Sequence, residues 1–192
     1  MQVDVQSKQT VFHDVFTIEE AKVRFQKFNG EMSQTARRMV FERGDSAAAL
    51  VFNRDTQKVL LINQFRYPTY DKGPGWIHEI VAGTMDEGEQ PEQTIRREIH
   101  EEIGYEVRHD LIPIATFYVS PGGSSERIHL YYVEVGSADH VSQGGGVASE
   151  HEDIELVELT LPDLKQAVEQ GQIMDAKTLI AAQWFLNKVV RS

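Results

Sequence analysis

Cysteine is absent from this 192-residue chain, and so are long apolar runs. Without cysteine there is neither a disulfide framework nor a thiol nucleophile. No stretch reaches the roughly 18 consecutive apolar residues of a membrane-spanning helix. The first residues, MQVDVQSKQT, also lack the apolar core of a signal peptide. We therefore expect no membrane partner and a cytoplasmic protein.

Positive charge is scarce as well. The chain has 19 Lys and Arg residues against 30 Asp and Glu residues, which gives a formal net charge of −11. Such a chain repels the phosphate backbone of nucleic acids, so we expect no nucleic-acid partner. An acidic protein can still bind a phosphate-bearing substrate when metal ions lie between the two sets of negative charges.

Several common catalytic motifs are missing too. The glycine run at 144–146 is not followed by Lys-Ser/Thr, so it is not a phosphate-binding P-loop. The seven histidines show no metal-ligand spacing, and no nucleophile elbow of a serine hydrolase is present. We interpret the glycine run as a hinge for the acidic loop that follows it.

The most informative stretch is residues 83–105, GTMDEGEQPEQTIRREIHEEIGY. It predicts a loop followed by a helix that Gly104 ends. On such a helix Glu98 and Glu102 lie one turn apart, with Glu101 beside them. Carboxylates at this spacing either face solvent, which is the commoner case, or bind a cation. Oxygen ligands without nearby His or Cys suit Mg²⁺ or Mn²⁺.

This spacing resembles the signature of the Nudix hydrolases, which is Gly, five residues, Glu, seven residues, then Arg-Glu-apolar-any-Glu-Glu-any-Gly-apolar. The matching residues are Gly83, Glu89, Arg97, Glu98, Ile99, Glu101, Glu102, Gly104 and Tyr105. Tyr105 is a departure, because the family usually has an aliphatic residue there. Four further stretches, 28–44, 62–67, 120–127 and 144–155, resemble the branch that contains ADP-ribose and GDP-mannose pyrophosphatases.

Many strands with three helical stretches predict an α+β fold. We expect two strands within 11–30, two within 36–52, one each at 58–66, 76–82, 105–118, 127–136 and 152–160, and helices at 90–103, 162–171 and 176–190. The resemblance implies the Nudix fold, a mixed β-sheet sandwich flanked by helices, with a small N-terminal antiparallel β subdomain. We assign residues 1–44 to that subdomain, exchanged across a homodimer, and residues 45–192 to the Nudix hydrolase domain.

The resemblance also implies a metal site on the acidic helix. Its ligands would be Glu98 and Glu102, together with the backbone carbonyl of Ala82. Glu101 would either bind the metal or support a ligand, and Arg97 would hold the acids in place by charge pairing.

In this branch the catalytic base lies on a loop after the signature. The matching segment is 149–153, and we assign the base to Glu150 and an additional metal ligand to Glu152, with the order of the two roles left open. Taken without the resemblance, the same segment is typical of an exposed acidic turn.

Four residues are predicted to bind substrate. Arg43 and Arg66 each end a predicted strand, and a guanidinium group suits phosphate oxygens; surface ion pairs are the alternative. The resemblance implies that Glu126 supports the substrate or the metal. Phe16 would stack on the base from the partner subunit, with packing in the core as the alternative.

Together these features predict hydrolysis of the pyrophosphate bond of ADP-ribose to AMP and ribose 5-phosphate, with Mg²⁺ as cofactor. Another nucleoside diphosphate sugar, such as GDP-mannose, is the alternative substrate. A nucleotide-sensing module without catalysis is a third possibility, which the complete set of signature glutamates disfavours.

Overall fold

The computed structural model describes residues 1–147, 149 and 151–190. It divides into two compact units, unit 1 (Met1–Asp45 with Tyr118–Arg127) and unit 2 (Ser46–Phe117 with Ile128–Ser192), and each is described by itself. The strands are β1 (Val3–His13), β2 (Thr17–Phe25), β3 (Ala36–Glu42), β4 (Ser46–Asn53), β5 (Lys58–Phe65), β6 (Trp76–Glu79), β7 (Val81–Thr84), β8 (Ile112–Tyr118), β9 (Arg127–Val135) and β10 (Ile154–Thr160). The helices are α1 (Tyr67–Tyr70), α2 (Pro91–Ile103), α3 (Leu161–Glu169) and α4 (Ala176–Val190), with a short 3₁₀ turn, η1 (Ser137–Asp139).

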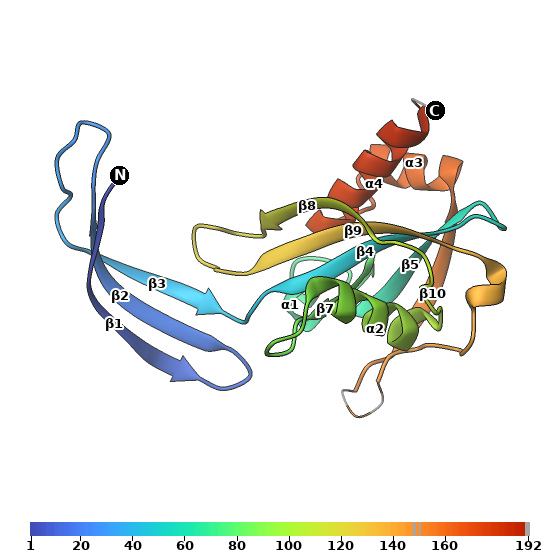
Figure 1. Ribbon diagram of the computed structural model, residues 1–192, viewed down its shortest axis with the longest axis horizontal. Coiled ribbons are helices and arrows are strands. Elements are labelled where there is room, and N and C mark those ends of the chain that lie inside the picture. Colours follow the sequence, from blue (N-terminus) through green and yellow to red (C-terminus); the bar gives the residue numbers. More distant parts are fainter. Residues whose placement is uncertain (148, 150, 191–192) are drawn as a thin grey trace. The chain divides into compact units, whose positions relative to one another are not determined.

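Unit 1, whose residues are all described, contains an antiparallel sheet in the order β1-β2-β3 (Figure 1). The prediction of two strands within 11–30 is wrong, because β2 is the one strand that lies wholly in this segment, and its partner β1 begins at Val3 and ends at His13. Every residue of β1 is exposed. A strand without a buried face has no need of strict apolar alternation, and this removes the signal on which the prediction depended.

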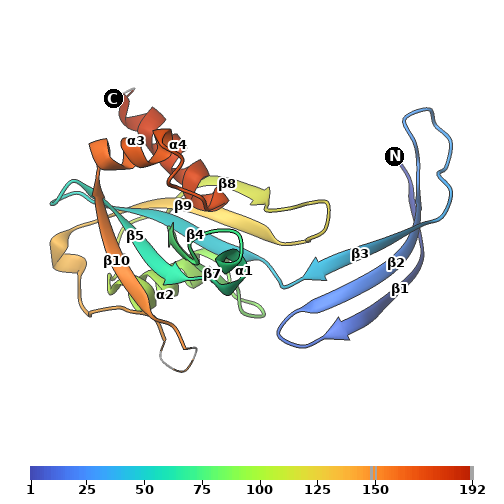
Figure 2. The ribbon, with the colours of Figure 1, turned by 180° about the vertical axis from the view of Figure 1, so that it is seen from behind.

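Unit 2 is built on a mixed sheet. Within the described residues its order is β10-β5-β4-β9-β8, with β6 paired to β5 and β7 paired to β4. Strands β4 and β9 are parallel, whereas β4 runs antiparallel to β5 and β7. Helix α2 covers one face of this sheet, and α3 and α4 cover the other, as the two opposite views in Figures 1 and 2 show.

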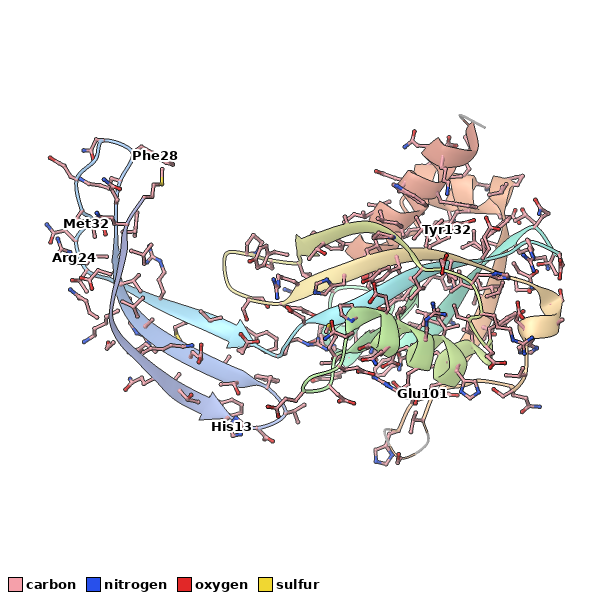
Figure 3. The ribbon with its side chains drawn as sticks, in the orientation of Figure 1. His13, Arg24, Phe28, Met32, Glu101 and Tyr132 are labelled. Atoms are coloured by element: carbon pink, nitrogen blue, oxygen red, sulfur yellow. The ribbon has the colours of Figure 1, made fainter. Side chains whose placement is uncertain are left out.

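The core of unit 2 lies on both faces of the sheet. Strand β4 reads SAAALVFN and is buried along its whole length, as expected for a central strand with both faces covered. Ala48, Leu50 and Phe52 pack on the α3–α4 side, and the alternate residues pack on the α2 side. Tyr132 of β9, labelled in Figure 3, packs against Phe185 of α4 with 5.5 Å between ring centroids.

Helix α2 has well-defined ends. Gln90 and Gln93 form a capping box at its start, and Pro91 takes the first helical position, where a missing N–H costs nothing. Gly104 ends the helix in the left-handed conformation at φ 73°, as its sequence position predicts. These ends fix which residues of the helix face the sheet.

Two predicted strands differ from the structure. The segment 76–82 forms two strands, because β6 pairs with β5 and β7 pairs with β4, with a break at Ile80. The segment 105–118 is a strand only from Ile112 onward. No helix in the described part of the chain is long and apolar enough to span a membrane.

Candidate active site

Arg97 links the acids of α2 and of the loop before it. Its Nη1 atom lies 2.7 Å from Glu98 Oε1 and 3.0 Å from Glu101 Oε2. Its Nη2 atom lies 3.3 Å from Glu89 Oε2. One guanidinium group therefore holds three carboxylates in fixed positions, one of them Glu101, which Figure 3 labels on α2.

Glu89 ties the loop to the helix. Its carboxylate accepts hydrogen bonds from the Thr94 hydroxyl at 2.7 Å and from the Asp86 backbone N–H at 3.2 Å. The hydrogen bonds from Arg97 and Thr94 hold the pKa of Glu89 below its ordinary value. The loop therefore reaches α2 through a carboxylate that stays ionised.

Glu102 is a carboxylate in the protein interior. Its side chain is buried and accepts a hydrogen bond from the Ala82 backbone N–H at 3.4 Å. Burial raises the pKa of Glu102 to about 9, with further contributions from the charges of Glu98 and Glu152. Burial also raises the pKa of Glu98, and the ion pair with Arg97 offsets only part of this rise. These acids lack sufficient positive charge around them to favour their ionised forms.

Gly83 leaves room for one of these acids. A Cβ atom at this position would lie 1.8 Å from Glu98 Oε1, which is far inside van der Waals contact. The side chain of Glu98 therefore lies directly over the backbone of β7. This close approach explains the glycine at the start of the signature without appeal to backbone conformation.

The glycine run brings Glu152 to the same helix. Gly145 and Gly146 donate backbone hydrogen bonds to the carbonyl oxygens of Glu102 and Glu101, at 2.9 and 3.1 Å. Glu152 accepts a hydrogen bond from the Val147 N–H at 2.9 Å, and its charge acts on both Glu98 and Glu102. The proposed base, Glu150, lies outside the described residues. The segment thus contacts the end of α2 directly, a contact that the sequence did not reveal.

Arg66 belongs to a buried charge cluster that sequence reasoning found only in part. Its Nε atom donates to Glu79 Oε1 at 2.7 Å, and Lys177 of α4 forms an ion pair with the other oxygen of Glu79. Lys177 also lies 3.1 Å from Asp175. Burial alone would lower the pKa of Arg66, but Glu79 and the charges of Glu102 and Glu152 raise it. No signal in the sequence indicates that Lys177 joins this cluster, because Glu79 is 98 residues away along the chain.

The remaining predicted residues belong to unit 1. There Arg43 Nε lies 3.8 Å from Glu126 Oε1, so the two form an ion pair. Phe16 is partly exposed and packs against Phe41 and Phe12, with 4.6 and 5.6 Å between ring centroids. The substrate roles predicted for these residues remain predictions.

The donor set of α2 fits a hard divalent cation. The candidate ligands are carboxylate oxygens. The buried Glu102 and the partly buried Glu98 have raised pKa values, which is the electrostatic situation that a bound cation would relieve. Within the described residues no group of three acidic or histidine side chains is arranged as a metal site. Arg97 and backbone amides instead form hydrogen bonds with several of the carboxylate oxygens. A bound metal ion would have to replace some of these hydrogen bonds.

The class of the protein follows from this site and from the fold. A model of the NUDIX domain matches residues 42–177, and the chain belongs to this family. The predicted resemblance is thereby confirmed, and the chain is a Nudix hydrolase. Nudix hydrolases generally use a divalent metal ion.

The similar proteins of known activity fall under two names, ADP-ribose pyrophosphatase and GDP-mannose pyrophosphatase. The ADP-ribose pyrophosphatase of Escherichia coli (strain K12) is 38% identical over 185 residues, which cover 95% of this chain and 87% of the relative. The GDP-mannose pyrophosphatase of Cronobacter sakazakii is 42% identical over 149 residues, covering 77% and 76%. The crystal structure of an ADP compounds hydrolase superposes with a TM-score of 0.73 at 18% identity, covering 99% of this chain and 94% of that one. This last similarity confirms the predicted fold class.

Proposed function

We propose that the chain hydrolyses the pyrophosphate bond of ADP-ribose, giving AMP and ribose 5-phosphate, with Mg²⁺ as its cofactor. The observation that carries this proposal is the pairing of the buried Glu102 with the partly buried Glu98, whose charges the surrounding protein leaves incompletely compensated. The relative with the broadest coverage quoted above is an ADP-ribose pyrophosphatase, which supports this substrate.

The proposed roles follow from chemistry and position. A bound divalent ion neutralises the diphosphate and lowers the pKa of bound water. This ion would be held by Glu98, Glu102, Glu152 and the backbone carbonyl of Ala82. Glu101 would either bind the ion as well or support one of its ligands. Arg97 orients the acids through its ion pairs.

The remaining roles concern the substrate and the water. Arg66, held by Glu79, would bind the diphosphate, because its guanidinium group carries more than one hydrogen-bond donor. Glu150 would take the proton of the attacking water. Arg43, Glu126 and Phe16 would contact the remainder of the substrate.

Replacing Glu98 by Gln tests the proposal most directly. We expect Glu98→Gln to lower kcat for ADP-ribose at least about 1000-fold, since it removes a charged ligand while keeping the shape of the side chain. Product formation is followed by chromatography, and circular dichroism checks that the fold is kept. A folded Glu98→Gln protein with the rate of the unchanged chain would refute the site.

GDP-mannose is the second candidate substrate, favoured by the relative from Cronobacter sakazakii. A panel of nucleoside diphosphate sugars, compared by kcat/KM, decides between the two. We expect the highest value with ADP-ribose. A higher value with GDP-mannose would leave the chemistry in place and correct the substrate.

We also propose that the protein is a homodimer in which a second copy covers unit 1. None of the residues of unit 1 is buried, and the apolar side chains of Val3, Phe12 and Phe28 are exposed. A sheet of three strands needs a covered face for independent stability. Light scattering should give twice the chain mass; a monomer at all concentrations would remove the dimer and the role of Phe16 in a shared site.

A further inference from the structure

Gln64 is a polar side chain in the interior of β5. The residue is 7% exposed, and its amide oxygen Oε1 is shielded from solvent and accepts no hydrogen bond from any described residue. A buried acceptor without a partner destabilises a fold, whereas an apolar side chain of the same shape would not. Residues 59–62 of the same strand are all apolar and buried, so Gln64 stands out from its surroundings.

The pairing of β5 shows which face the Gln64 side chain occupies. Gln64 lies two residues after Ile62, which packs in the core beneath α2, so both side chains point to that face. Directly opposite Gln64 is Ile154 of β10, a member of the same core. The carboxamide therefore lies on the side of the sheet that carries the acids of α2.

Charged groups of the candidate active site lie along the same face of the sheet. Arg66 follows Gln64 by two residues, and its guanidinium reaches Glu79, which stands opposite Ile62 in the register. The Arg66 side chain therefore extends toward the Ile62–Glu79 pair, in the direction of Gln64. The charges of Glu102 and Glu152 act on Arg66, and Glu152 precedes Ile154 by two residues.

We propose that Gln64 is a positioning residue of the hydrolytic centre, whose amide oxygen accepts a hydrogen bond from a water molecule bound to the divalent ion at Glu102 and Glu152. A neutral oxygen suits this place, because it accepts from water without adding a further negative charge to the acids. The inference rests on the proposed function, since it takes these acids to be metal ligands. It explains why a polar group is kept in an apolar strand, since metal binding completes its hydrogen bonding.

The variant Gln64→Met tests this role, because it removes the amide and keeps a similar side-chain length. In EDTA we expect its melting temperature to equal or exceed that of the unchanged protein, since an unpartnered polar group is lost. Titration with MgCl₂ in a calorimeter should show an affinity about 10-fold weaker, in the range of changes next to metal ligands. The kcat for ADP-ribose should fall by a similar factor with little change in KM.

Two controls sharpen the result. Gln64→Glu keeps an oxygen acceptor and should bind Mg²⁺ within about threefold of the unchanged protein or more tightly. Asn63→Ala, at the neighbouring position on the opposite face of β5, should change neither affinity nor rate. An unchanged Mg²⁺ affinity in Gln64→Met, an equal loss in Gln64→Glu, or a lower melting temperature of Gln64→Met in EDTA would overturn the inference.

The test also separates this inference from the proposed function. If the unchanged protein binds Mg²⁺ but cleaves no nucleoside diphosphate sugar, the proposed function fails, and the magnesium titrations still decide the role of Gln64. If it cleaves ADP-ribose and Gln64→Met binds Mg²⁺ normally, the proposed function stands and the inference on Gln64 is wrong.

Discussion

Unit 2 buries apolar side chains on both faces of its sheet, whereas unit 1, in which every residue is described, buries none. Unit 1 is held by backbone pairing of its three strands and by cross-strand ion pairs such as Lys8–Glu19 at 2.8 Å. Exposed ion pairs of this kind contribute little. Apolar burial thus accounts for the stability of unit 2 and leaves that of unit 1 dependent on whatever covers it.

The acids of the two units differ in the same way. In unit 2, burial raises the pKa of Glu102 to about 9. In unit 1, hydrogen bonds from the Ser125 hydroxyl and the Gly44 N–H lower the pKa of Glu42. A carboxylate kept in the interior at a cost to stability marks a functional site, whereas a carboxylate stabilised at the surface is typical of structural support.

The largest expected difference between the units is in stability, when one valine in each unit is replaced by alanine and so loses two methyl groups. Val51 is fully buried in β4, and Val15 is 94% exposed between β1 and β2. We expect Val51→Ala to lower the free energy of unfolding by about 1.5–3 kcal/mol, and Val15→Ala to change it by less than about 0.5 kcal/mol. Urea unfolding measures both. A similar loss for Val15→Ala would mean that another surface covers that turn in solution.

The next effect comes from a methyl group added to one glycine in each unit. In Gly83→Ala the new Cβ displaces the carboxylate of Glu98, so we expect kcat to fall about 100-fold with the fold retained, roughly the loss of one well-placed catalytic interaction. In Gly122→Ala the Cβ meets no atom within 4 Å, and the rate should not change. Steady-state kinetics and circular dichroism compare the two. Equal rates in both variants would show that the position of Glu98 is unimportant.

The smallest effect is the pH dependence of the free energy of unfolding, measured on the metal-free protein in EDTA. Because the folded-state pKa of Glu102 lies above its ordinary value of 4.5, this group's stabilising contribution is complete below pH 4.5 and is lost as pH rises toward 9. The lowered pKa of Glu42 gives the opposite sign, with stability lost as pH falls below 4.5.

Urea unfolding between pH 5 and 8.5 checks this sign. Glu102→Gln should flatten the decline of stability with rising pH, whereas Glu42→Gln should leave the decline unchanged. An identical decline in Glu102→Gln and the unchanged protein would show that Glu102 is ionised in the fold without metal.

Local chemistry accounts for what the sequence could predict. Pro91 and Gly104 define the ends of α2, and the spacing of its acids defines their common side, so the helix and its carboxylates followed from residues close in the chain. The uninterrupted apolar runs of β4 and β5 were equally local signals.

Contacts between distant residues account for what the sequence could not predict. The ion pair of Glu79 with Lys177 joins residues 98 positions apart. The break at Ile80 depends on two different partner strands, and the exposed β1 offers no burial pattern to detect. The unpartnered oxygen of Gln64 becomes visible only when its neighbours across β5 are known.

The two hydrogen bonds from Gly145 and Gly146 to the end of α2 set a length constraint on the chain. They fix the starting point of the following segment, so the reach of Glu152 depends only on the few residues between. The loops in the longer stretch between Gly104 and Gly144 can gain or lose residues without altering that reach. A single insertion between Gly146 and Glu152 would instead carry the carboxylate past its place, so natural variation in length should accumulate before the glycine run and avoid the residues after it.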